Sequence, residues 1–584
     1  MFDLPRSSWA DYDAKLISEG GGIFLRSAKS IPISPQMQAR FDISADKLAP
    51  TELLNALLKA PVDLLWNGGI GTYVKSSRET HADVGDKAND SLRVNGCELR
   101  AKVVGEGGNL GMTQLGRVEY GLNGGSGNTD FIDNAGGVDC SDHEVNIKIL
   151  LNEIVAAGDM TGKQRNKLLA EMTDDVGSLV LHNNYKQTQA LSLAERLAHE
   201  RLAEYKRLMA ALEADGKLDR ALEFLPTDEE LNERASQGRG LTRPELSVLI
   251  SYSKIDLKEA LLKSRVPDDA YLAREMETAF PARLTAEFGE PMRRHRLKRE
   301  IVSTQLANDL VNHMGITFVQ RLKESTGMSA ANVAGAYVIV RDVFRLPHWW
   351  QQIEALDYQV PAQLQLSLMD ELMRLGRRAT RWFLRSRRNE LDAARDVAHF
   401  APKIVQLASQ LDDLLEGPAR EHWLGRYQAF VEAGVPQELA RMVAGTSHLY
   451  TLLPIIEAAD VTGQDAAEVA VAYFSVGSRL ELSWYLQQIN ALAVQSNWQA
   501  LAREAFRDDL DWQQRAITVS VLQIKDGAGA IEQRVDHWLQ QHAQAVARWQ
   551  AMLAELRAAT TADYAMYAVA NRELVDLAQS GSKG

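Results

Sequence analysis

Cysteine is scarce in this sequence: 584 residues contain two, Cys97 and Cys140. Two cysteines cannot supply the disulfide framework of a secreted domain, so we expect a cytoplasmic protein. The sequence has no run of about 18 apolar residues, the length that spans a bilayer, so we expect no membrane segment. The first residues, MFDLPRSSWADYD, lack the basic flank and apolar stretch of a signal peptide.

Positive charge is also in deficit, with 65 Lys and Arg against 78 Asp and Glu. The net charge of −13 argues against general nucleic-acid binding and leaves room for local basic patches. Metal motifs of the HExxH and CxxC types are missing, and so is the GxSxG motif of serine hydrolases. We interpret His143, which lies between Asp142 and Glu144, as structural. The sequence therefore predicts no metal site.

The dinucleotide fingerprint GxGxxG is missing as well. The segment GEGGNLG at 105–111 is the one that can be mistaken for it, but Leu110 stands where the last glycine is required. A doubly wound nucleotide-binding domain normally opens with this fingerprint. We therefore expect no complete domain of that kind in this sequence.

Glycine is plentiful in clusters up to about residue 140, and scattered after it. Three short apolar runs lead into glycine and asparagine loops and are predicted to be buried strands: Val62–Trp66, Ala101–Val104 and Thr129–Ile132. Buried strands of this kind are typical of a parallel sheet, in which ligands bind beyond the carboxyl ends of the strands. The sequence predicts an α/β fold with part of a doubly wound (Rossmann-like) parallel sheet in residues 1–150. A large all-α domain is predicted for 151–584.

The second part has several helix signals. Thr227 and Glu230, and likewise Thr242 and Glu245, have the spacing of a capping box, and apolar residues recur at helical spacing in 301–314. A basic stretch, RRATRWFLRSRR at 377–388, would place its arginines on one helix face. We favour a solvated face that pairs with nearby acidic residues over an anionic effector site or an interface with an acidic domain. The residues concerned are Arg377, Arg381, Arg385 and Arg388 on the basic side and Asp370, Glu371, Glu390 and Asp392 on the acidic side.

Three segments, VDLLWNGGIG (62–71), AKVVGEGGNLGMTQ (101–114) and DFIDNAGGVDCSDHE (130–144), resemble the last strands and loops of the nucleotide-binding domain of glutamate dehydrogenases. NAGGV is the most specific of these motifs. The insertion at 79–96 and the long helical part are similar to the very large NAD-specific bacterial members. The resemblance covers the whole chain, as the C-terminal portion of a longer protein. It implies oxidative deamination of L-glutamate to 2-oxoglutarate and ammonium with NAD as cofactor.

The resemblance also implies roles for six residues. Gly68 and Gly69 correspond to main chain close to the cofactor, and Asn109 and Asn134 to the asparagines around the nicotinamide ribose and carboxamide. Val138 corresponds to the apolar wall for the substrate side chain, and Ser141 to the hydroxyl that binds the distal carboxylate of glutamate. The alternative role for Ser141 is to cap a helix that begins near Asp142.

The family's Gly-Gly-x-Lys motif and its catalytic lysine and aspartate have no counterpart here. We therefore expect no catalytic residue in this chain, and we expect the isolated chain to be inactive. Its expected partners are the missing N-terminal region of the same protein and further copies in a homo-oligomer. Two alternatives stay open. One is a dehydrogenase for an apolar amino acid, and the other is a non-catalytic helical regulatory or scaffold protein with a residual nucleotide-binding fold.

Overall fold

The computed structural model describes residues 7–387, 390–494, 496–524, 530–559, 561 and 563–581. The chain forms two compact units. The first comprises Met1–Asp268 and Ala273–Thr317, and the second comprises Asp269–Leu272 and Phe318–Gly584. Across the described ranges no helix is both long and apolar enough to cross a membrane.

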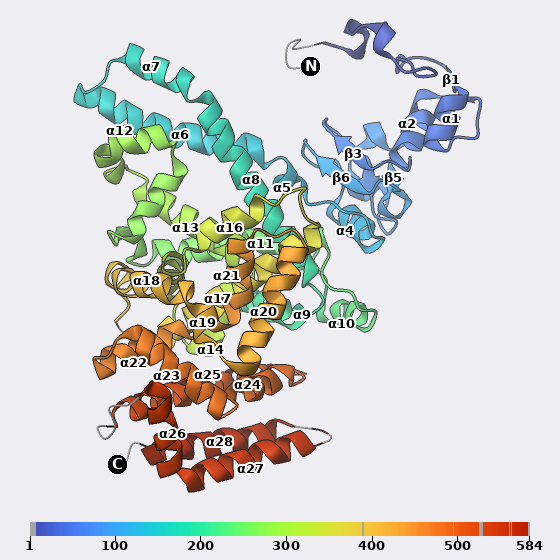
Figure 1. Ribbon diagram of the computed structural model, residues 1–584. Coiled ribbons are helices and arrows are strands. Elements are labelled where there is room, and N and C mark those ends of the chain that lie inside the picture. Colours follow the sequence, from blue (N-terminus) through green and yellow to red (C-terminus); the bar gives the residue numbers. More distant parts are fainter. Residues whose placement is uncertain are drawn as a thin grey trace. The chain divides into compact units, whose positions relative to one another are not determined.

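The strands of the first unit lie between residues 31 and 106 and alternate with short helices, and every later element of the unit is helical (Figure 1). Its strands are β1 (Ile31–Pro32), β2 (Lys47–Leu48), β3 (Leu64–Asn67), β4 (Val74–Lys75), β5 (Val94–Asn95) and β6 (Val103–Glu106). Its α-helices are α1 (Pro35–Phe41), α2 (Pro50–Leu58), α3 (His81–Val84), α4 (Gln114–Leu122), α5 (Asp130–Asp133), α6 (Ala135–Ala157), α7 (Gly162–Glu171), α8 (Thr173–Arg196), α9 (Leu202–Ala214), α10 (Asp228–Ser236), α11 (Arg243–Leu262), α12 (Ala282–Arg293) and α13 (Lys298–Met314).

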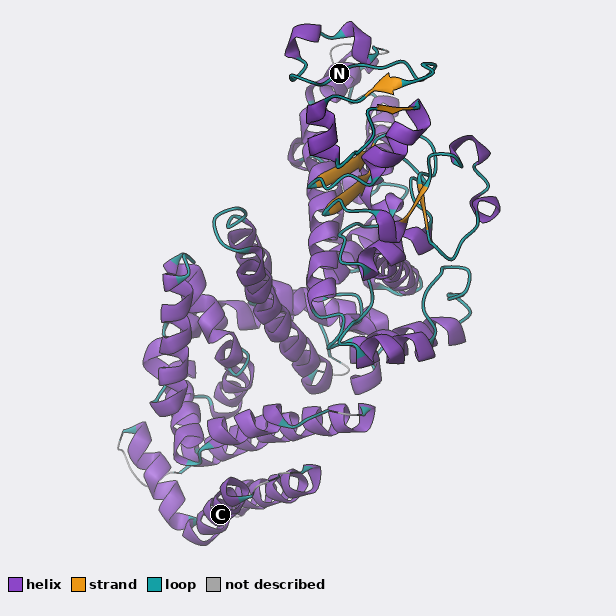
Figure 2. Cartoon of the chain, turned by 90° about the vertical axis from the view of Figure 1, so that its right-hand side faces the viewer, coloured by secondary structure: helices purple, strands orange, loops and turns teal. Residues whose placement is uncertain are grey.

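The second unit is helical in every element that the structure describes (Figure 2). Its helices are α14 (Phe318–Thr326), α15 (Ala330–Val343), α16 (Leu346–Glu354), α17 (Ala362–Ser386), α18 (Ala393–Ser409), α19 (Leu411–Leu414), α20 (Gly417–Glu432), α21 (Gln437–Leu449), α22 (Leu452–Thr462), α23 (Ala466–Arg479), α24 (Leu482–Ala491), α25 (Asn497–Leu522), α26 (Ile531–Gln541), α27 (Ala543–Ala558) and α28 (Tyr564–Gly581). The predicted order, α/β followed by all-α, is confirmed.

Two of the three predicted strands are present. Strands β3 and β6 lie side by side and parallel, with Leu64 opposite Val103 and Asn67 opposite Glu106 (Figure 1). Both begin two residues later than predicted. A second parallel pair joins β4 to β5, and β1 pairs with β2 antiparallel. The parallel pieces of a Rossmann-like sheet are therefore confirmed.

The third predicted strand, Thr129–Ile132, is wrong, because this segment forms the helical turn α5. A helical turn places Asp130 and Asp133, three residues apart, on one side. There Asp130 accepts a hydrogen bond from the backbone N–H of Leu110 (2.8 Å), and Asp133 accepts one from the backbone N–H of Glu106 (3.0 Å). An extended strand would point these two carboxylates to opposite faces.

The helix signals of the second part are confirmed. Thr227 and Thr242 form capping boxes with Glu230 and Glu245, and the apolar pattern at 301–314 lies within α13. The domain boundary expected at residue 150 stays a prediction, and α6 runs across that position.

Candidate functional site

Two glycine loops meet at the carboxyl ends of β3 and β6. Gly68 and Gly69 follow β3, and Gly107 and Gly108 follow β6. Because the two strands are parallel, their carboxyl ends lie at the same edge of the sheet. A Cβ atom added to Gly108 would come within 2.8 Å of the carbonyl oxygen of Gly69. The close approach of the two loops therefore requires glycine at position 108.

Asn109, which follows Gly107 and Gly108 in the loop after β6, forms a hydrogen bond with Asn134. The side-chain Nδ2 of Asn134 donates to Oδ1 of Asn109 at 2.5 Å. Asn109 belongs to the loop after β6, and Asn134 is the residue immediately before α6. No described residue bonds the side-chain Nδ2 of Asn109 or the side-chain Oδ1 of Asn134, so a donor and an acceptor remain for a ligand. An amide-bearing ligand needs such a donor and acceptor side by side.

A buried ion pair fixes the loop after β6. Glu106 is 1% exposed, and its two carboxylate oxygens accept from Nε (2.6 Å) and Nη2 (3.0 Å) of Arg117 on α4. Glu106 also accepts from the backbone N–H of Met112 (3.0 Å), and Asp130 lies 3.3 Å from Arg117. Burial raises the pKa of Glu106, and the facing Arg117 guanidinium opposes that rise. Such a bidentate pair holds the strand end and its loop in one geometry.

Arg243, the first residue of α11, connects helices α8 and α11 to the carboxyl end of β6. Its Nε donates to Oδ1 of Asn128 (2.6 Å), whose Nδ2 donates to Asp133 (2.7 Å). On its other side Arg243 donates to the carbonyl oxygen of Thr188 and to the carboxylate of Glu195, each at 3.0 Å. Helices α8 and α11 therefore hold the segment that carries Asn134 against the loop after β6.

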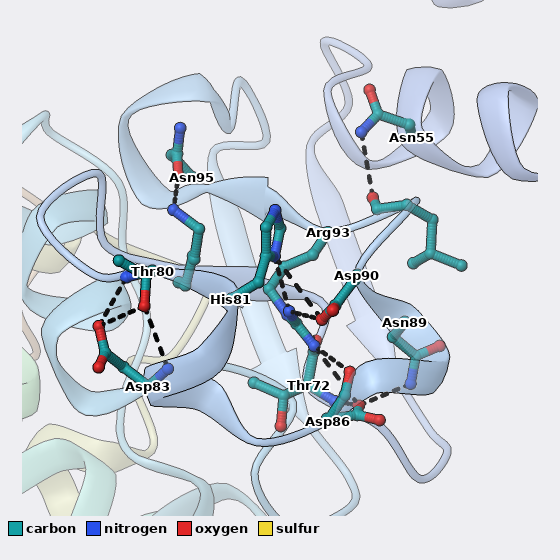
Figure 3. Close-up of polar contacts among 12 residues, drawn as sticks. Asn55, Thr72, Thr80, His81, Asp83, Asp86, Asn89, Asp90, Arg93 and Asn95 are labelled. Carbon is teal, nitrogen blue, oxygen red and sulfur yellow. Dashed lines mark hydrogen bonds and ion pairs between the residues drawn. The ribbon is translucent and has the colours of Figure 1, made fainter.

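Arg93 anchors the loop after β3, and the sequence reasoning missed it. Its side chain is fully buried and donates to the carbonyl oxygens of Thr72 (2.8 Å) and Asp86 (2.6 Å) and to Asp90 (2.6 Å) (Figure 3). The ring of His81 lies against the same guanidinium at 2.8 Å. Thr72 directly follows the glycine loop and donates its hydroxyl to the carbonyl oxygen of Leu110. The sequence does contain a signal for this role: Arg93 is the single arginine of segment 79–96, which also contains three aspartates.

Val138 and Ser141 lie on the solvent-facing side of α6. They follow Asn134 by four and seven residues, so all three share one face of the helix. Val138 is 66% exposed, and Ser141 is exposed and donates its hydroxyl to the carbonyl oxygen of Gly137 at 3.2 Å. The expectation of a helix beginning near Asp142 is wrong, because α6 begins at Ala135, so Ser141 cannot cap it.

The opposite side of α6 packs on the helices behind it. His143 is buried, and its Nδ1 lies 2.9 Å from the carbonyl oxygen of Ala279. Asn183 on α8 donates to Asp139 at 2.9 Å and lies 3.3 Å from His143. Nearby, Lys254 donates to Gln187 (2.6 Å), and burial lowers the pKa of its ammonium to about 7. In the described ranges no group of three or more His, Cys, Asp or Glu side chains is arranged to hold a metal ion.

The structure thus brings the predicted residues to one surface of the first unit. Gly69 adjoins the loop that carries Asn109, Asn109 bonds Asn134, and Asn134 leads into the helix face that presents Val138 and Ser141. Gly68 lies in the same loop as Gly69. The individual roles of these six residues stay predictions.

Comparisons with known proteins cover the whole chain. A family model described as glutamate dehydrogenase, C-terminal, matches residues 238–576, and one described as bacterial NAD-glutamate dehydrogenase, catalytic domain, matches 1–194. Similar curated proteins, each named NAD-specific glutamate dehydrogenase, occur in Pseudomonas aeruginosa (80% identical over 584 residues), Halomonas elongata (55% over 583) and Mycobacterium tuberculosis (40% over 590). Each alignment covers 100% of this chain and 36% of the relative. The chain therefore spans about a third of the length of these relatives.

Proposed function

This chain belongs to the family of the NAD-specific bacterial glutamate dehydrogenases, and we propose that it supplies the end of the nucleotide-binding domain and the helical C-terminal domain of such an enzyme. The proposed reaction is the oxidative deamination of L-glutamate to 2-oxoglutarate and ammonium, with NAD as cofactor. The observation that carries the proposal is the bonded pair Asn109–Asn134 beside the glycine loops of two parallel strands.

The residues present fit a nicotinamide nucleotide. A Cβ atom added to Gly69 would meet no atom within 4 Å, so the main chain there is open to a ligand lying flat against it. The free donor of Asn109 and the free acceptor of Asn134 match the two halves of a carboxamide. When bound, NAD accepts the hydride from the substrate, and the protein supplies orientation.

The exposed face of α6 supports the substrate assignment. Val138 offers an apolar wall for the side-chain methylenes of glutamate, and Ser141 offers a hydroxyl to its distal carboxylate. A carboxylate that leaves water must be hydrogen-bonded, which is why a hydroxyl at this position favours glutamate over an apolar amino acid. Asn134 starts the same helix face, so cofactor and substrate would be aligned by one rigid element.

The two-stranded sheet supports a longer protein. Leu64 and Trp66 of β3 are 57% and 60% exposed, and Val103 of β6 is also exposed. Parallel sheets are normally covered on both faces. We propose that the upstream region of the longer protein covers these side chains and supplies the catalytic residues, and that the whole enzyme is a cytoplasmic homo-oligomer. Residues 1–584 alone should then show no glutamate-dependent reduction of NAD, and turnover at about 10 per second, an ordinary enzymatic rate, would contradict this assignment.

The site is tested in the intact enzyme with Asn109→Ala and Asn134→Ala. Each change removes a neutral hydrogen bond to the cofactor, so the KM for NAD should rise about two- to tenfold. Asn123→Ala is the matched control, because its amide is exposed and bonds the carbonyl oxygen of Glu119 in the same part of the first unit. A KM for NAD that stays at the wild-type value in both variants would remove these asparagines from the site.

A further inference from the structure

The arginines of α17 line a small pocket in the second unit together with residues of α14 and α25. The pocket has a volume of about 40 Å³. Five arginines and three carboxylates border it, so positive charge is in excess. The arginines are Arg321, Arg377, Arg378, Arg381 and Arg507, and the carboxylates are Glu504, Asp508 and Asp511. Arg388 of the predicted basic face lies outside the described residues.

Two of these carboxylates are each shared by two arginines. Glu504 lies 2.6 Å from Arg321 and also bonds Arg381. Asp508 lies 2.8 Å from Arg381 and also bonds Arg385. The expected pairing of this face with acidic residues nearby in the sequence is therefore wrong for Arg381, which is largely buried against α25.

The third carboxylate is occupied as well. Asp511 accepts from the hydroxyl of Tyr450 (2.8 Å) and from Arg378 (3.4 Å). The Arg378 guanidinium lies 4.1 Å from the centre of the Tyr450 ring, an arrangement that fixes its plane. Each of the three carboxylates at the pocket is thus already engaged by at least one arginine.

Arg507 forms no ion pair with any residue that the structure describes. Within the part of the chain that the structure describes, no carboxylate lies within 4 Å of its guanidinium, and its Nε makes a long contact with the carbonyl oxygen of Arg503 (3.4 Å). Burial lowers the pKa of Arg507 to about 10; the like charge of Arg378 adds to this effect, and the carboxylate of Glu504, which lies beyond ion-pair distance, opposes it. The Ser325 hydroxyl also borders the pocket, is enclosed, and makes no hydrogen bond to any described group.

The size of the pocket limits what can enter it. A water molecule needs about 10–15 Å³ of accessible cavity volume, so the pocket holds one small group and excludes a whole nucleotide. A phosphate or carboxylate group has this size, and guanidinium forks match its oxygens. We propose that this arginine pocket binds the phosphate or carboxylate group of a small anionic ligand, with Arg507 and Ser325 as donors. The pocket is a site separate from the proposed nucleotide site and does not depend on it.

The test measures binding of inorganic phosphate and of malonate to residues 1–584 by isothermal titration, with chloride at equal ionic strength as the reference. Arg507→Met should weaken binding by about tenfold or more, because it removes a hydrogen bond to a charged group. Arg572→Met is the matched control, because this arginine is exposed on α28 and pairs with Asp576 (3.2 Å). Its affinity for either anion should equal that of the wild type.

Thermal unfolding separates this role from a purely structural one. Without phosphate, Arg507→Met should unfold at or above the wild-type temperature, since it relieves repulsion among arginines. With phosphate, the wild type should gain in melting temperature and the variant should not. Ser325→Ala, a smaller change, gives the same test by titration if the Arg507 variant fails to fold. Binding of neither anion, or full affinity in both variants, would overturn the proposal. Binding of phosphate alone would identify the ligand group as a phosphate, and binding of malonate alone would identify it as a carboxylate.

Discussion

Asn134 and Asn109 join two elements that are 25 residues apart in the sequence: the start of α6 and the loop after β6. This bond makes the orientation of the α6 face depend on the same loop that approaches Gly69. A proposed nucleotide site and a proposed substrate site thereby share one rigid frame. The buried pair Glu106–Arg117 and the Arg243 contacts hold that frame from behind.

Arg93→Met should loosen the loop after β3. The variant loses four contacts of a fully buried guanidinium and leaves Asp90 without its closest partner. Because Asp90 is 37% exposed, the cost should fall below the about 3–5 kcal/mol of a fully buried pair and above the about 1 kcal/mol of an exposed one. We expect a lower free energy of unfolding for the first unit, and faster hydrogen exchange at the backbone amides of residues 70–74.

The control for this change is Arg100→Met, because Arg100 is exposed and pairs with Asp42 at 2.8 Å. Its loss should cost less than about 1 kcal/mol, as for other exposed pairs. Equal destabilisation by the two variants would show that Arg93 does not anchor the loop.

The sequence predicted the parts of the site that depend on local pattern. Apolar runs that end in glycine marked β3 and β6, but the start of α6 at Ala135 was missed, because a helix was expected only near Asp142. The third run failed because its aspartates serve as acceptors for a loop that lies 20 or more residues earlier. The helix and strand propensities of residues 129–132 themselves do not reveal partners that lie so far away in the sequence.

Partners distant in sequence could not be predicted either. Arg243 bonds Asn128 across 115 residues, and Arg381 reaches Asp508 across 127. Charge pairs at helical spacing are the ones that a sequence makes visible. The basic face of α17 was therefore assigned to neighbours in sequence, although packing against α25 decides its partners.

Lys254→Met should stabilise the first unit at neutral pH. Burial lowers the pKa of Lys254 to about 7, so the folded state disfavours the charged form that the unfolded chain holds below about pH 10.5. The resulting cost to the wild type appears as pH falls from about 10.5 to about 7. We expect a gain of a few kcal/mol in the variant at pH 7 and a much smaller gain near pH 10, measured by urea unfolding.

Lys148→Met provides the control, because Lys148 is exposed on α6 and pairs with Glu144 at 3.2 Å. Its effect should be small at both pH values. A Lys254 variant whose stability difference does not change between the two pH values would contradict the buried-ammonium explanation.

Glu504→Gln should change the acid sensitivity of the second unit. Burial alone would raise the pKa of Glu504, but Arg321 and Arg381 outweigh it and lower the pKa to about 2. A lowered carboxyl pKa contributes stability that is present above the unfolded value, about 4.5, and is lost as pH falls toward about 2. Between about pH 5 and pH 3 the wild type should therefore lose roughly 2 kcal/mol more than the variant.

Urea unfolding followed by circular dichroism at each pH measures this difference. Glu432→Gln, a change at an exposed position of α20, should keep the wild-type acid sensitivity. Parallel pH profiles for the wild type and the Glu504 variant would mean that Arg321 and Arg381 do not lower the pKa of Glu504.

Ser141→Ala tests the substrate assignment in the intact enzyme. If the hydroxyl binds the distal carboxylate of glutamate, its loss removes a hydrogen bond to a charged group, about 1.5–3 kcal/mol. The kcat/KM for glutamate should then fall roughly ten- to a hundredfold, while the value for norvaline, which lacks that carboxylate, should hardly change. The KM for NAD should also stay near the wild-type value, because the lost contact is to substrate alone.

A structural effect of Ser141→Ala would have a different signature. The Ser141 hydroxyl donates within its own helix to the carbonyl oxygen of Gly137, and alanine is a better helix former than serine, so the melting temperature should not fall. Ser178→Ala is the matched control, because its hydroxyl makes the same contact four residues back, to Asp174 (2.9 Å), on exposed α8 surface. If the Ser141 variant keeps the wild-type preference for glutamate over norvaline, this hydroxyl does not bind the distal carboxylate.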